Sequence, residues 1–148
     1  MNECKPLVPG GDTLTALEGA AARAAPDMTP QELASTVWSL ATVGRTVGWT
    51  AGLKAAAALE AAAVQTAPRM HAQDVANFLR ANATLGRVPG PDARAALDAA
   101  VGRVCPRMDA NEVASTLWSY ATLGLTPGAA AGAALEAGAY TRPFFGST

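Results

Sequence analysis

The sequence predicts an all-α protein, an α-solenoid of about seven helices built from two-helix repeats of about 38 residues. Three observations support this fold class. Alanine accounts for 36 of the 148 residues, and it favours helices and lets neighbouring backbones approach closely. Isoleucine is absent and only 10 valines are present, which argues against a sheet protein. The chain also repeats itself, and units too small to bury their own apolar surface are stable when stacked.

The repeats are clearest in three segments that begin with methionine and end with glycine. Residues 28–44 and 108–124 are identical at ten of seventeen positions, and residues 70–86 form a related copy between them. Their spacings are 42 and 38 residues, with alanine-dense sequence in between. We therefore expect a partial repeat at 8–26, full repeats at 28–68, 70–106 and 108–140, and a tail at 141–148.

Each repeat is expected to hold two helices. The first helix starts with a capping box, Thr29 with Glu32 in one copy and Asp109 with Glu112 in another, and ends at a glycine that favours a left-handed backbone. Those glycines are Gly44, Gly86 and Gly124. The second helices are expected at about 12–25, 49–67, 92–105 and 128–140, and the first three stop at prolines 26, 68 and 106.

Composition excludes several classes of function. The net charge of −1 gives no overall attraction to nucleic acid or to an anionic membrane. The single histidine, His71, has no catalytic partner at a recognisable spacing, and the acidic residues form no metal-binding pattern. We therefore expect no enzyme activity, no metal and no cofactor.

The repeated motifs resemble those of a known family. Residues 30–44 read PQELASTVWSLATVG and residues 111–124 read NEVASTLWSYATLG, similar to the signature of the octotricopeptide repeat proteins of green-algal organelles. This resemblance implies a right-handed superhelix that binds single-stranded RNA and acts in organellar RNA processing, stability or translation. It also implies a chloroplast location, although no transit peptide is visible and the chain is expected to be a fragment or a small relative.

The residues expected to read RNA bases lie in two polar columns of the first helices. In helical-repeat RNA-binding proteins such side chains contact base edges, and Gln and Asn amides donate and accept together. The columns are Gln31, Gln73, Asn111 and, one turn on, Ser35, Asn77, Ser115. The alternative is that these residues only solvate an exposed face. Arg80 joins the predicted site because it replaces a tryptophan in an apolar column.

Four arginines at the repeat junctions are expected to contact phosphates, in two rows along the edges of the stack. Arg45 and Arg87 follow a glycine, whereas Arg69 and Arg107 follow a proline. Such rows would make RNA binding depend on salt. Neither row is complete, so ordinary solvated surface arginines are the alternative.

Three aromatic residues complete the candidate set. Trp38 and Trp118 follow the phase of the apolar face, so we expect them in the core, with base stacking as the alternative. Phe78 stands where the other copies have threonine, and it is either an exposed stacking aromatic or a further core residue.

Two functions from different classes remain open. The first is a single-stranded RNA-binding module, which the resemblance and the Gln and Asn columns favour. The second is a protein-interaction scaffold that holds a partner segment, which the near-zero net charge favours. Partners are therefore single-stranded RNA or, through the ends of the stack, other repeat proteins or a second copy of the chain. No membrane is expected among them.

Overall fold

The chain folds into helices throughout the part that the computed structural model describes, residues 11–47, 53–128, 131–133 and 135–136. The α-helices are α1 Gly11–Ala24, α2 Pro30–Val47, α3 Leu53–Thr66, α4 Ala72–Leu85, α5 Pro91–Val104 and α6 Ala110–Leu123. Short 3₁₀ helices follow α1, α3 and α5, at Ala25–Asp27, Ala67–Arg69 and Cys105–Arg107. Helical residues appear again at 131–133 and 135–136. No strand occurs in these ranges, and the predicted all-α class is confirmed.

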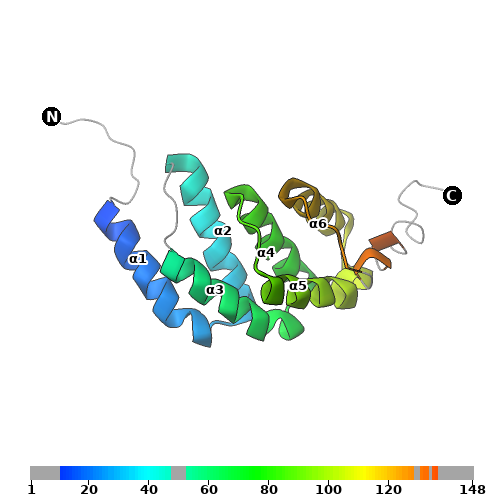
Figure 1. Cartoon of the computed structure of the whole chain (residues 1–148), viewed down its shortest axis with the longest axis horizontal. Helices are drawn as coiled ribbons and strands as arrows, with labels where there is room; N and C mark the ends of the chain where they lie inside the picture. Colours follow the sequence, from blue (N-terminus) through cyan, green and yellow to red (C-terminus); the bar gives the residue numbers. More distant parts are fainter. Residues whose placement is uncertain (1–10, 48–52, 129–130, 134, 137–148) are drawn as a thin grey trace.

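The helices form two layers. Helix α2 packs against α4 and α4 against α6, while α1 packs against α3 and α3 against α5. Figure 1 shows α2, α4 and α6 in the upper row and α1, α3 and α5 in the lower row. Each repeat thus adds one helix to each layer, as in an α-solenoid. We call α2, α4 and α6 the first helices and α1, α3 and α5 the second helices.

Small residues join one first helix to the next. The flank that α2 turns toward α4 carries Ala34, Val37 and Ala41, and the equivalent flank of α4 carries Ala76, Leu79 and Ala83; all six are buried. In α6 the same positions are Ala114, Leu117 and Ala121, and these are exposed, with Leu117 at 46%. The described residues therefore leave this flank of α6 uncovered.

A repeated carboxylate contact joins successive second helices. Glu60 Oε2 accepts a hydrogen bond of 2.9 Å from the Gly90 amide at the start of α5. Thirty-eight residues later, Asp98 Oδ2 accepts one of 3.1 Å from the Gly128 amide. A Cβ at Gly90 would lie 2.6 Å from the Glu60 oxygen, and one at Gly128 would lie 2.8 Å from the Asp98 oxygen. A side chain at either glycine would therefore displace the carboxylate from this contact.

Tyr120 links helix α6 to the carboxylate of Asp98. Its hydroxyl donates to Asp98 Oδ1. Burial, followed by the hydrogen bond to Asp98, raises the pKa of Tyr120 above its ordinary range, so the hydroxyl stays protonated and remains a donor. Asp98 thus accepts from both layers.

The predicted starts of the first helices are confirmed. The Thr29 amide donates to Glu32 and the Glu32 amide donates back to the Thr29 hydroxyl, at 3.0 and 3.1 Å. Asp109 and Glu112 form the same reciprocal pair at 3.0 and 2.8 Å. These bonds satisfy amides that a helix leaves free at its first turn.

Two of the three predicted helix ends are confirmed and one is wrong. Gly86 and Gly124 adopt left-handed backbones, with φ of 71° and 68°. Gly44 instead lies inside α2, which continues to Val47. Pro89 lies three residues after Gly86, and Pro127 lies three residues after Gly124. No proline occurs between Gly44 and Leu53. Nothing equivalent therefore stops α2 at its glycine.

The prolines that were expected to end the second helices each lie in a 3₁₀ turn. Pro26, Pro68 and Pro106 occupy the middle of these turns, so each α-helix ends two residues earlier. The predicted start at Trp49, the partial-repeat residues 8–10 and the tail at 141–148 lie outside the described residues.

Gly86 and Gly44 occupy equivalent positions in their repeats, yet replacement by alanine should change the free energy of unfolding in opposite directions. Gly86→Ala places a Cβ on a left-handed backbone and should lower the free energy of unfolding by about 1–2 kcal/mol. Gly44→Ala replaces a glycine within a helix and should raise it by about 0.5–1 kcal/mol. Chemical denaturation of both variants measures the difference. Equal effects at the two positions would contradict the assigned backbone conformations.

Candidate nucleic-acid interface

Each first helix leaves one side in contact with solvent. Side chains spaced four, three and four residues apart share one side of a helix. We call these twelve positions the first-helix face: Gln31, Ser35, Trp38 and Thr42 in α2; Gln73, Asn77, Arg80 and Thr84 in α4; Asn111, Ser115, Trp118 and Thr122 in α6. All twelve are exposed or half-buried. Because the three helices pack side by side, their stripes form one surface.

The polar residues predicted from the sequence all lie on this surface. Gln31, Ser35, Gln73, Asn77, Arg80 and Asn111 are exposed, and Ser115 is half-buried. None of them is covered by a neighbouring repeat. The structure therefore places both predicted columns and Arg80 on one solvent-facing surface.

The two tryptophans differ from each other. Trp38 is half-buried against the core, in keeping with its predicted core position. Trp118 is 49% exposed, so its predicted core position is wrong. The residues share a place in their helices, but α4 covers the flank of α2 beside Trp38, whereas no described helix covers the equivalent flank of α6. Sequence reasoning also left the three threonines out of the site, although their spacing from Gln31, Gln73 and Asn111 places them on this face.

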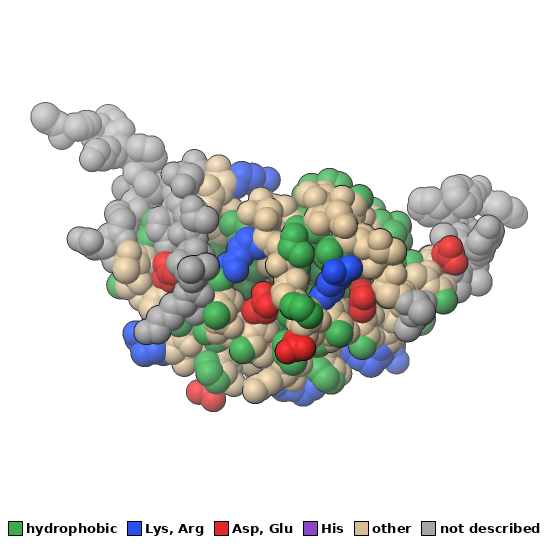
Figure 2. Space-filling view, in the orientation of Figure 1, with side chains coloured by type: hydrophobic (Ala, Val, Ile, Leu, Met, Phe, Trp, Pro, Cys, Tyr) green, Lys and Arg blue, Asp and Glu red, His purple; other side chains and the backbone are tan. Residues whose placement is uncertain are grey.

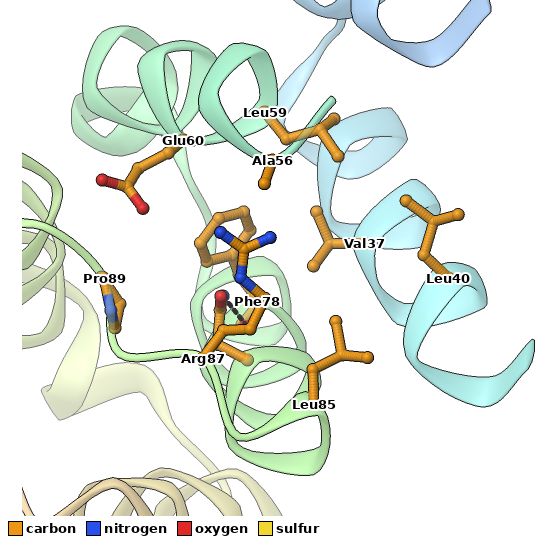
Figure 3. A pocket seen from close by; sticks show the side chains of 10 residues that line it. Val37, Leu40, Ala56, Leu59, Glu60, Phe78, Leu85, Arg87 and Pro89 are labelled. Carbon is orange, nitrogen blue, oxygen red and sulfur yellow. Dashed lines mark hydrogen bonds between the residues drawn. The ribbon is translucent and has the colours of Figure 1, made fainter. Parts of the chain in front are cut away.

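Phe78 is a core residue rather than an exposed aromatic. Its exposure is 3%, and it lines an apolar hollow between α2, α3 and α4 with Val37, Leu59 and Leu85. Figure 3 shows these side chains around the Phe78 ring. Phe78 lies on a flank of α4 that faces a neighbouring first helix. Its equivalent in α6, Thr116, is also fully buried.

Arg80 makes a defined contact on the first-helix face. Its guanidinium carbon lies 5.3 Å from the centre of the Trp38 ring, within the range of a cation–π interaction. The side chain is nevertheless exposed. It also lines a hollow together with Asn111, Ala114, Ser115 and Trp118. Arg80 therefore contacts α2 and shares a hollow with α6.

The first-helix face carries one arginine and no acidic residue. The carboxylates of the first helices instead accept hydrogen bonds at the helix starts, where Glu32, Asp74 and Glu112 bind the amides of the capping residues. Figure 2 shows acidic and basic side chains dispersed over the face in view, and hydrophobic side chains gathered over α6. The net charge of −1 therefore does not describe this surface.

The predicted phosphate-binding arginines lie at two opposite edges of the first-helix row. Arg45 is exposed in the last turn of α2, whereas Arg69 and Arg107 are exposed in the 3₁₀ turns that precede α4 and α6. Arg87 differs because it is half-buried and lines the hollow around Phe78. Figure 3 shows its side chain directed into that hollow. Three of the four arginines thus extend into solvent.

The described part of the chain contains no group of three or more His, Cys, Asp or Glu side chains placed to hold a metal ion. The described helices also include none with the length and apolar character needed to cross a membrane. His71 is exposed at the start of α4, and its amide donates to Asp74.

Comparison with known proteins gives one match. The family model described as the Tbc2 translation factor, N-terminal domain, matches residues 45–138, which is more than half of the chain. The matched region contains α3 to α6, and therefore Arg80 and Trp118. No curated protein and no solved structure matched the chain.

Proposed function

The chain belongs to the family of the Tbc2 translation factor N-terminal domain, and on that premise we propose that it is a single-stranded RNA-binding repeat module. The family match indicates a role in translation. The observation that carries the proposal is the first-helix face, which combines exposed amides, hydroxyls, an aromatic ring and a guanidinium with no acidic group. RNA-binding proteins use these groups to contact unpaired bases.

More specifically, we propose that the repeats of this chain are octotricopeptide repeats. This assignment is supported by the motifs at residues 30–44 and 111–124 and by the solenoid of two-helix repeats that contains them. On this assignment the module acts in the chloroplast, in translation and in RNA processing or stability. The uncovered flank of α6 supports a further proposal, that the module contacts other repeats there, in another protein or in a second copy.

Phosphate contacts by the edge arginines predict a defined salt dependence. Three contacts, by Arg45, Arg69 and Arg107, correspond to a slope of about −2 in log affinity against log salt, at about 0.7 per phosphate of a single strand. Replacing all three by Gln should bring the slope close to zero. Fluorescence anisotropy with labelled oligouridylate measures it.

Arg23→Gln is the matched control for this experiment, because Arg23 is exposed but lies on α1. It should leave the slope unchanged. An unchanged slope in the triple variant would remove the edge arginines from the site. Absence of binding by the parent chain at low salt would overturn the proposed function and favour the protein scaffold.

Arg80→Ala tests the middle of the first-helix face. The change should weaken RNA affinity about tenfold, because stacking contacts with bases are worth about 1–3 kcal/mol each. The fold should persist, since Arg80 is exposed and its contact with Trp38 is worth only about 0.5–1 kcal/mol. Anisotropy and thermal unfolding of the same sample measure both quantities. Equal affinity for the two chains would exclude Arg80 from binding.

A further inference from the structure

A hollow between α4 and α6 brings side chains of different chemistry to one place. Its lining consists of Arg80, Asn111, Ala114, Ser115 and Trp118. Ala114 is exposed here, whereas its equivalents Ala34 and Ala76 are buried beneath the next first helix. The small side chain leaves room beside the tryptophan ring.

Two polar side chains of this hollow form no side-chain hydrogen bond within the described fold. Several hydroxyls elsewhere donate to the carbonyl one turn before them, as in Thr42, Thr66 and Ser119. Among the described residues, neither the Ser115 hydroxyl nor the Asn111 amide has such a partner. Both groups are therefore free to bond to a ligand.

The equivalent place between α2 and α4 is different. There the guanidinium of Arg80 lies 5.3 Å from the centre of the Trp38 ring and covers it. Trp118 has no such cover, and 49% of its surface is exposed. One tryptophan ring is therefore covered by Arg80, whereas the other presents an open face in a hollow that Arg80 also lines.

We propose that this hollow binds one unpaired nucleobase, stacked on the open face of Trp118 within the lining that Arg80 shares. The Asn111 amide and the Ser115 hydroxyl, at two turns and one turn before Trp118, then bond to the edge of the base. Aromatic rings and guanidinium planes both stack on bases, and an amide can donate and accept at a base edge. This inference rests on the proposed function and assigns to Trp118 a role that its expected core position did not include.

Trp118→Ala in the full chain tests the proposal. With oligouridylate as the probe, affinity should fall about tenfold, and Trp118→Phe should recover most of it because a phenyl ring also stacks. The salt slope should stay unchanged, because stacking releases no counterions. Thermal unfolding of each variant should match that of the parent, since the side chain is exposed.

Leu17→Ala is the matched control, because Leu17 is exposed to a similar degree, 54%, but lies on α1 and does not line the hollow. It should bind like the parent. A second probe, the same oligomer with its bases removed, should bind the parent and Trp118→Ala equally. If Trp118→Ala binds oligouridylate as well as Leu17→Ala does, the base site is wrong while RNA binding stands. If the parent binds neither probe, the proposed function fails as well.

Discussion

The contact of one first helix with the next is the interaction on which this structure depends. Alanines at two positions of each joining flank, Ala34 and Ala41 in α2 and Ala76 and Ala83 in α4, let the backbones approach closely. A larger residue at these positions would separate neighbouring helices. Because the helices lie close together, their solvent-facing stripes become one surface rather than three separate ridges.

The second layer keeps these helices in register. Glu60 binds the amide at the start of α5 and Asp98 binds the Gly128 amide, and the two contacts are 38 residues apart, as the repeat requires. A carboxylate at a helix start is also favoured by the helix dipole. Tyr120 joins Asp98 to the first layer, so the position of α6 depends on both layers. The hollow that contains Trp118 therefore lies on a helix that contacts with both layers hold in place.

Sequence reasoning identified what depends on residue spacing within a helix. The capping boxes, the two-helix repeat and the polar columns through Gln73 and Asn77 follow from local chemistry and helical phase. It was less successful where identical residues have different neighbours. Trp38 and Trp118 occupy the same place in similar helices, yet among the described helices only Trp38 has a following first helix beside it. Gly44 matches Gly86 in the repeat, but the residues after it do not end the helix.

The site is less predictable than the fold for the same reason. The spacing of Arg80 from Gln73 places it on the polar stripe, but its contact with Trp38 depends on two separate helices. The open face of Trp118 likewise depends on which helices surround α6. Such relations between repeats determine which groups are free to bind a ligand.

The central claim is that single-stranded RNA lies along the first-helix face, and photo-crosslinking tests it most directly. Oligouridylate with thiouridine at single positions would be irradiated with the full chain, and the linked peptides identified by mass spectrometry. The account predicts links to α2, α4 and α6, with Trp118 among the linked residues. Links confined to α1, α3 and α5 would contradict it.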